Sequence, residues 1–159
     1  MGINIYLEPV KDRGFTIVKK SVIEGHGLFA RKNIPKGSRI LEYAGQRVMK
    51  KKLASDLVNG LTSLRYLMRL DDKTVIDAER NGNDSRFINH SCAPNCIVYF
   101  FNNTPYIYTL LEIKKDEELS FDYRMAIGNS KKELSRSQKK ALMPCACGAK
   151  ECRGTMLAN

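Results

Sequence analysis

Apolar and polar residues alternate in short runs along most of the chain, and turn-forming residues separate the runs. Two turns lie at residues 24–27 and 33–37, and two more lie at residues 71–73 and 102–105. Short alternating runs bounded by Gly, Pro, Asn and Asp are typical of β-strands joined by tight turns. The pattern predicts a mainly β fold with short helices. The predicted strands are 14–23, 28–30, 39–43, 64–70, 74–77, 97–101 and 106–111.

Two segments have a spacing of apolar residues that indicates a helix. Residues 47–57 place Val48, Leu53 and Leu57 on one side, and the lysines at 50–52 face water. Residues 130–142 are rich in Lys and Ser, with a few apolar residues near helical spacing. We expect a helix over 47–57, and a basic linker with one short helix over 130–142.

The composition is that of one globular domain. A chain of 159 residues is long enough for one compact domain and too short for two ordinary ones. No stretch approaches the roughly 20 apolar residues that a membrane span needs. The first residues, MGINIYLEPVKDR, lack the basic segment and apolar run of a secretory signal. We therefore expect neither membrane insertion nor export by that route.

Positive charge is concentrated near the C-terminus. The net charge is +10, and residues 124–159 hold 8 basic and 2 acidic residues, which is +6 of that total. Such a surplus favours contact with nucleic acid, nucleosomal DNA or an acidic membrane surface. The same residues could equally form a solvated face.

Five cysteines lie in two groups. Cys145, Cys147 and Cys152 fall within eight residues, and Cys92 and Cys96 form the other group. An odd number argues against a closed disulfide framework, whereas three clustered thiols suit a thiophilic metal ion. Structural zinc takes four ligands in a tetrahedron. The fourth could come from Cys92, Cys96, His26 or His90, and the competing interpretation is buried free thiols or transient oxidation.

Two further segments are candidates for a binding site. Asn89-His90-Ser91-Cys92 places an amide, an imidazole, a hydroxyl and a thiol in four consecutive positions. Gly25-His26-Gly27 would let a ligand approach the backbone, although glycine pairs usually mark turns. Tyrosines can line a narrow apolar channel while offering hydroxyl groups.

Several longer motifs occur in a defined order between residues 21 and 157. They are GHGLFA, IPKGSRILEYAG, YLMRLDD, VIDAERNGNDSRFINHSCAPNC, IKKDEELSFDY and PCACGAKECRGTM. Together they resemble the SET-domain protein lysine methyltransferases followed by a post-SET zinc segment, with the trithorax-type members closest. The resemblance implies small, mostly antiparallel sheets with a C-terminal pseudoknot.

The resemblance also implies a division of the chain. Residues 1–20 would be an N-terminal flank, and residues 21–124 the SET domain, with a variable insert at 46–63. Residues 125–144 would be a basic linker and 145–159 the post-SET zinc segment. Two features depart from the family pattern: there is no cysteine-rich segment before the SET domain, and the 21 residues between Tyr123 and Cys145 form a long, basic link.

By position, the resemblance assigns roles to single residues. Tyr123 would lie beside the methyl-transfer centre, Tyr66 would line the lysine channel, and Phe121 would occupy the position that controls product degree, favouring dimethyl- or trimethyl-lysine. One zinc ion would be held by Cys92, Cys145, Cys147 and Cys152, bringing Met156 and Leu157 towards the cofactor. The S-adenosylmethionine site would comprise Gly25, His26, Gly27, Tyr43, Arg86, Asn89, His90 and Leu157.

The implied substrate is a protein lysine, with a histone tail or nucleosome favoured and DNA contact through the basic tail. The implied location is the nucleus or chromatin, including that of a host cell if the source is bacterial or viral. Acidic contacts for a histone tail could come from Glu42, Asp71, Asp72, Asp77 and Glu79. The sequence does not predict the oligomeric state.

Two other functions would account for part of the sequence. A zinc-stabilised nucleic-acid-binding module would explain the charge and the thiols, but it leaves NHSC and ELSFDY unexplained. An inactive SET scaffold is disfavoured because Asn89, His90 and Tyr123 are all present.

Overall fold

The computed structural model describes residues 14–126 and 133–158, and the regular secondary structure of those residues is mainly short strands. The strands are β1 (Thr16–Lys20), β2 (His26–Ala30), β3 (Arg39–Glu42), β4 (Gln46–Met49), β5 (Leu67–Arg69), β6 (Thr74–Asp77), β7 (Asn89–His90), β8 (Cys96–Phe101), β9 (Thr104–Thr109) and β10 (Ser120–Phe121). The helices are α1 (Lys50–Val58), α2 (Arg136–Leu142) and a 3-10 turn, η1 (Asp84–Phe87).

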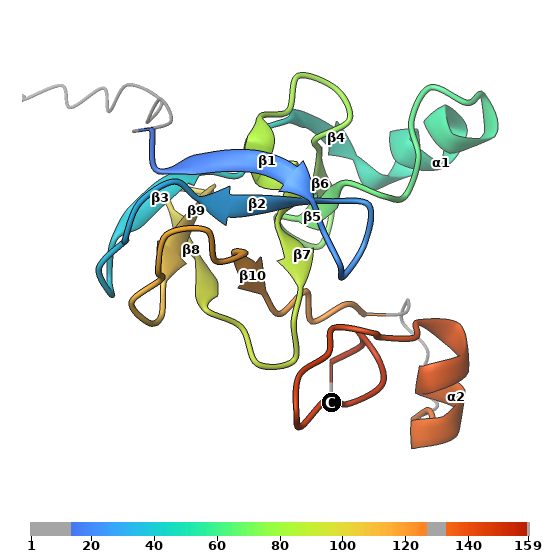
Figure 1. The fold of residues 1–159 in the computed structure, drawn as a ribbon. Coiled ribbons are helices and arrows are strands. Elements are labelled where there is room, and N and C mark those ends of the chain that lie inside the picture. Colours follow the sequence, from blue (N-terminus) through green and yellow to red (C-terminus); the bar gives the residue numbers. More distant parts are fainter. Residues whose placement is uncertain (1–13, 127–132, 159) are drawn as a thin grey trace, which may run out of the picture.

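The strands form four small sheets (Figure 1). Three are antiparallel: β1 with β2, β9 between β3 and β8, and β6 between β4 and β5. The fourth is a parallel pair of β7 and β10. Apolar side chains from several sheets meet in one core, including the fully buried Leu28, Ile34, Ile40, Ile107 and Ile113. The predicted mainly β fold of small, mostly antiparallel sheets is confirmed.

The β8–β9 hairpin has a tighter turn than predicted. Phe101 pairs directly with Thr104, so only Asn102 and Asn103 form the turn. Both have positive φ, 47° and 58°, which asparagine tolerates and which matches the twist of a two-residue hairpin. Strand β9 therefore begins at Thr104, inside the predicted turn.

The predicted helix over 47–57 is wrong in its first turn. Residues up to Met49 belong to β4, and α1 begins at Lys50. Val48 pairs with Val75 of β6, and both are buried with Leu53 of α1. Pairing with an existing strand outweighs weak helical spacing, because a β-branched side chain packs well on a pleated surface.

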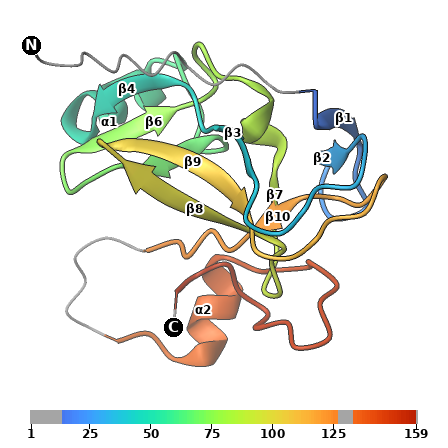
Figure 2. The same cartoon turned by 90° about the vertical axis from the view of Figure 1, so that its left-hand side faces the viewer.

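The C-terminal segment lies against the end of the molecule that carries β7 and β10, on the far side from α1 (Figures 1 and 2). A short helix was predicted within 130–142, and α2 lies there, although residues 127–132 are outside the described part of the chain. Ser135 and Gln138 form a capping box at its start. Neither α-helix in the described ranges has the length and apolar character needed to cross a membrane.

Backbone hydrogen bonds attach this segment to the rest of the chain. The amide of Met125 donates to the carbonyl of Met156 at 3.0 Å, and that of Ala158 donates to Met125 at 2.9 Å. Within the segment, the Thr155 hydroxyl lies 2.9 Å from the carbonyls of both Lys139 and Met143. The last residues thus join α2 to the chain that leaves β10.

Candidate functional site

The β7–β10 pair brings together two motifs that are about 30 residues apart. Asn89 is in register with Ser120, and His90 with Phe121. The buried Asn95 side chain supports β10: its amide donates to the carbonyl of Glu118, and its oxygen accepts from the amide of Ser120, both at 2.8 Å. Two-residue strands leave no periodic signal, so the sequence did not predict them.

Asn89 holds the loop that connects β1 and β2. Its side-chain amide lies 2.8 Å from Glu118 Oε1 and 3.1 Å from both Ser21 Oγ and the carbonyl of His26. Ser21 in turn donates to Glu118 at 2.7 Å. Sequence reasoning missed Glu118, whose carboxylate connects β7 to the loop.

Gly25 in this loop and Gly27 in β2 are glycines for different structural reasons. Gly25 has a φ of +44°, which favours glycine because a Cβ is strained there. A Cβ on Gly27 would collide with the carboxylate of Glu118. His26 between them is exposed, and its ring centroid lies 6.0 Å from that of Phe87.

A cavity of about 180 Å³ lies between β7, the β1–β2 loop and the C-terminal segment. Of the residues predicted to bind a cofactor or react, Asn89, His90 and Tyr123 line it, and Met156 does so as well. The remainder of the lining comes from Ile23, Glu24, Pro144, Cys145, Ala146 and Cys147. Gly25, His26, Gly27, Tyr43, Arg86 and Leu157, predicted for the same site, are not part of this lining. Leu157 is instead buried in the attachment of the C-terminal segment.

Three tyrosines lie close to one another beside this cavity. The Tyr123 hydroxyl donates to the carbonyl of Ile88 at 2.9 Å, and that of Tyr43 donates to the carbonyl of Tyr66 at 3.3 Å. Burial, followed by the neighbouring Tyr43, Glu24 and Tyr66, raises the pKa of Tyr123. Burial and the nearby Asp77 carboxylate likewise raise the pKa of Tyr43. Both phenols are therefore neutral hydrogen-bond donors at physiological pH.

Aromatic rings pack against two of these tyrosines. The ring centroids of Phe121 and Tyr123 are 5.0 Å apart. Those of Tyr66 and Phe87 are 6.0 Å apart, and these two rings meet edge to face. The Arg86 guanidinium lies 4.8 Å from the Phe87 ring centroid. Among the described residues, its buried Nε has no hydrogen-bond partner. A buried donor without a partner carries a free-energy cost unless a bound group accepts from it.

His90 connects Tyr123 to a thiol. The backbone amide of Tyr123 donates to Nδ1 of His90 at 3.2 Å, so Nδ1 must carry no proton. The ring proton then lies on Nε2, which is 3.4 Å from Sγ of Cys92. Burial lowers the pKa of His90, and the Asp122 carboxylate only partly offsets this effect. A neutral ring fits both contacts.

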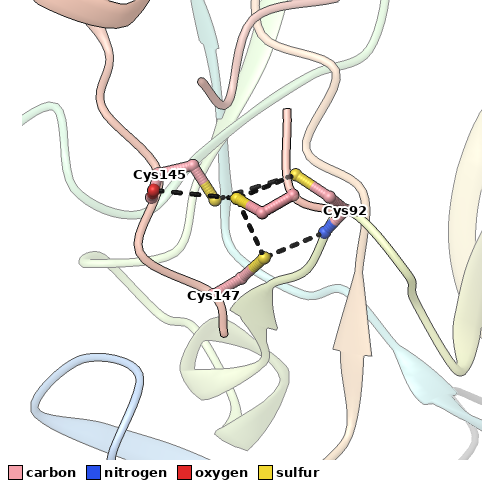
Figure 3. Close-up of side chains that lie close together, drawn as sticks. Cys92, Cys145 and Cys147 are labelled. Carbon is pink, nitrogen blue, oxygen red and sulfur yellow. Dashed lines mark hydrogen bonds between the residues drawn. The ribbon is translucent and has the colours of Figure 1, made fainter. Parts of the chain in front are cut away.

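The sulfur atoms of Cys92, Cys145, Cys147 and Cys152 all lie within 4.8 Å of one another. In Figure 3 the side chains of Cys145 and Cys147, from one segment of the chain, point towards that of Cys92, from a distant one. Sγ of Cys92 lies 3.8 Å from that of Cys145 and 3.9 Å from that of Cys152, and Cys147 and Cys152 are 3.7 Å apart. Four thiolates around zinc at about 2.3 Å would be separated by about 3.8 Å in a tetrahedron.

The surroundings of the sulfurs also suit thiolates. The amide of Cys92 donates to Cys147 Sγ, and the amide of Gly154 donates to Cys152 Sγ, at 3.4 and 3.3 Å. Donors of this kind stabilise negative charge on a ligand. The cluster is therefore compatible with a structural zinc ion. Cys96, one of the alternatives that the sequence left open, is buried elsewhere, and burial raises its pKa to about 12.

Sequence reasoning also missed an ion pair beside this cluster. The Arg153 guanidinium donates to both carboxylate oxygens of Asp122, at 2.7 and 2.8 Å. Asp122 lies between Phe121 and Tyr123, and Arg153 follows Cys152. No spacing rule predicts a contact between charged residues 31 positions apart.

One of the acidic residues considered for a histone-binding groove does not fit that role. Asp77 is fully buried and pairs with Arg80 at 2.8 Å. Asp71 caps the β5–β6 turn through the amides of Lys73 and Thr74, and Glu79 accepts from the amide of Ser63.

Residues 25–124 match the family model described as the SET domain. The chain belongs to the SET-domain family. Among its relatives is a fungal "Histone-lysine N-methyltransferase, H3 lysine-4 specific" from Chaetomium globosum, 39% identical over 143 residues. Two human relatives, "Histone-lysine N-methyltransferase 2B" and "Histone-lysine N-methyltransferase SETD1B", are each 37% identical, over 144 and 147 residues.

The similarity to these SET-domain proteins covers most of this chain but little of each relative. The aligned region is 85 to 86% of the chain and 12%, 5% and 7% of the three relatives respectively. The prediction of a SET domain related to trithorax-type histone methyltransferases is confirmed.

Proposed function

We propose that this SET domain is an S-adenosylmethionine-dependent protein lysine N-methyltransferase. The observation that carries the proposal is the meeting of Asn89, His90 and Tyr123 around one cavity, in a chain whose relatives are named histone-lysine N-methyltransferases. S-adenosylmethionine supplies a methyl group on a positively charged sulfur. Asn89, His90 and the β1–β2 loop would bind it, with Met156 and the segment 144–147 on the opposite side.

The substrate lysine needs to lose its proton before it accepts a methyl group. An amine in water has a pKa of about 10.4, and a partly buried site beside a positive charge lowers it. The neutral phenol of Tyr123 cannot accept that proton at physiological pH. Its role would be to orient the amine. Tyr66 and Phe121 would line the channel that aligns the reacting atoms.

Phe121 would set the number of methyl groups. A phenylalanine lacks the hydroxyl that could hold a water molecule in the space next to the amine. The ring is buried against Tyr123, so the space it leaves is determined by packing. We infer a dimethyl- or trimethyl-lysine product.

Cys92, Cys145, Cys147 and Cys152 would hold one zinc ion. Zinc there would supply a structural cross-link between the β7 region and the C-terminal segment. Because Cys145 and Cys147 also line the cavity, their placement would affect the cofactor site directly.

We propose to divide the chain after an N-terminal flank at 1–20 into a SET domain at 21–124 with an insert at 46–63, a basic linker at 125–144 and a post-SET segment at 145–159.

We infer a histone tail or nucleosome as the substrate and chromatin as the location, in the nucleus of the source organism or of a host cell. The names of the relatives and the net charge of +10 support this choice. Contact with DNA would use basic residues of the C-terminal region, among which Arg136, Lys140 and Lys150 are exposed. Glu42, Asp72 and the cavity-lining Glu24 are the acidic residues that could meet a basic tail.

The experiment is transfer of radiolabelled methyl groups to intact nucleosomes, free histones and whole-cell extract. We expect a labelled histone, with Tyr123→Phe strongly reduced. Cofactor binding without transfer to any protein would favour an inactive scaffold. Salt-sensitive DNA binding without cofactor binding would favour the nucleic-acid-binding module.

A further inference from the structure

Arg153 contacts both the sulfur cluster and Asp122, which lies just after β10 and just before Tyr123. Its guanidinium binds the two oxygens of Asp122 at 2.7 and 2.8 Å, and its backbone amide donates to Cys92 Sγ at 3.4 Å. Asp122 is bonded directly to Tyr123 in the chain. A single residue thus joins a proposed zinc ligand to the backbone that holds Tyr123.

The ion pair restricts the orientation of the two side chains as well as the distance between them. A guanidinium that donates to both oxygens of a carboxylate fixes the relative orientation of the two planar groups. The carboxylate also accepts from the amide of Arg124 at 3.1 Å, which ties it to the turn after Tyr123. The backbone from Phe121 to Arg124 is therefore oriented by Arg153.

The charges of the pair are stable at physiological pH. Burial would raise the pKa of Asp122, but the hydrogen bonds from Arg153 and the amide of Arg124 hold it below its usual value. The hydrogen bonds to Asp122 raise the pKa of Arg153. Both side chains are 22% exposed, so water screens the pair only in part.

A second residue, His90, also connects Cys92 to the backbone of Tyr123. His90 accepts from the amide of Tyr123 and directs its other nitrogen to Cys92 Sγ. Displacement of Cys92 would therefore reach Tyr123 through His90 on one side and through Arg153 and Asp122 on the other. The two connections also meet, because Asp122 Oδ1 lies 3.6 Å from His90 Nδ1. Neither Arg153 nor Asp122 lines the cavity, so their ion pair can be changed without replacing a lining residue.

We propose that Arg153 is a positioning residue that couples the cysteine cluster to Tyr123. This inference rests on the proposed methyltransferase function. Arg153 touches neither the cavity nor Tyr123 directly, and it acts through Asp122 and Cys92. Coupling of this kind is reciprocal, so a change at Asp122 should also alter how the cluster holds zinc.

The test compares Arg153→Lys, Asp122→Asn and the double variant, with the exposed Arg31→Lys as the matched control. Lysine keeps the charge but loses the two-point contact. Methyl transfer to a histone peptide is measured in a single turnover and normalised to bound zinc. The rate of zinc release to a chelator is measured separately, as a readout that requires no activity.

We expect about a tenfold loss of the zinc-normalised rate in each single variant, with the half-saturating peptide concentration changed by less than about twofold. Zinc release from Asp122→Asn should be about tenfold faster, although Asp122 touches no cysteine, and the double variant should resemble the single ones. The control should match the unmodified chain in both measurements.

Three results would overturn the inference: unchanged zinc-normalised rates, zinc release from Asp122→Asn at the unmodified rate, or independent losses that multiply in the double variant. If the unmodified chain transfers no methyl group, the proposed function fails. The zinc-release comparison would then still decide whether Asp122 and the cluster are coupled.

Discussion

Substitution of Phe121 tests most simply how many methyl groups the product lysine receives. Its ring is buried and lies 5.0 Å from that of Tyr123. Phe121→Tyr would add one hydroxyl at the position where a second or third methyl group needs space. We expect a shift from dimethyl- or trimethyl-lysine to monomethyl-lysine, measured by mass spectrometry of a peptide product. Strict monomethylation by both proteins would contradict the assignment.

Tyr123 allows a prediction about pH. Burial raises the pKa of its phenol, so the neutral form is favoured in the folded state. The resulting stabilisation is complete below the unfolded value of about 10 and is lost only as the pH rises through the higher folded value. Between about pH 7 and pH 9 the rate should rise as substrate lysine deprotonates, and Tyr123 should cause no decline.

A pH profile of single-turnover methyl transfer checks this. A loss of rate below about pH 9.5 that disappears in Tyr123→Phe would mean that the phenol ionises in that range.

At the scale of residues, the sequence identified those whose chemistry lies within a compact motif. Asn89, His90 and Tyr123 do line one cavity, and the four cysteine sulfurs do meet. Residues that work through distant partners were missed. Glu118 acts on Ser21 and Asn89, and Arg153 acts on Asp122, and nothing in local spacing indicates which carboxylate meets which donor.

Strand β2 depends on a residue that is distant in the sequence, Glu118. A methyl group at Gly27 would collide with the Glu118 carboxylate that also binds Ser21 and Asn89. We expect Gly27→Ala to lower the free energy of unfolding by about 1–3 kcal/mol and to weaken S-adenosylmethionine binding. Urea denaturation and calorimetric titration measure the two effects.

Gly37→Ala is the matched control. Its φ of +78° makes alanine strained, at a cost of about 1–2 kcal/mol, but the space around it is open. It should therefore destabilise the fold without changing cofactor affinity. Equal cofactor affinity in both variants would contradict the role given to the β1–β2 loop.

At the scale of elements, the sequence predicted the strands and turns that are marked by alternating apolar residues and by turn-forming residues. The hairpins β5–β6 and β8–β9 lie at or close to the predicted positions. β4 was mistaken for helix because its neighbour β6 is 25 residues away and decides its pairing. β7 and β10 have two residues each, too few for any pattern, although they assemble the site.

The distribution of charge gives a prediction for the whole molecule. Arg136 and Lys140 are exposed on α2, in the basic C-terminal region. Replacing both with Gln should weaken nucleosome binding and reduce the slope of its logarithmic salt dependence by about 2. Methylation of a short peptide should be unaffected.

Lys36→Gln with Lys115→Gln removes the same charge from exposed positions elsewhere and serves as the control. Binding should change much less in the control than in the α2 variant. Equal losses would indicate a diffuse electrostatic effect rather than contact through α2.

Charge asymmetry can be read from the sequence, but the docking of the C-terminal segment cannot. It depends on Met125 bonding to Met156, on Arg153 bonding to Asp122 and on Cys92 meeting three distant thiols. The segment held by these contacts contributes Pro144, Cys145, Ala146, Cys147 and Met156 to the cavity lining. The proposed cofactor site is therefore lined jointly by the SET domain and the cysteine-rich segment.

Calorimetric titration of S-adenosylmethionine into the zinc-loaded chain, and into the same chain after zinc removal, tests this claim most directly. We expect saturable binding at one site in the zinc-loaded chain, at least about tenfold weaker binding after zinc removal, and recovery when zinc is restored. Equal affinity with and without zinc, in a chain shown to have bound and lost the metal, would contradict the account.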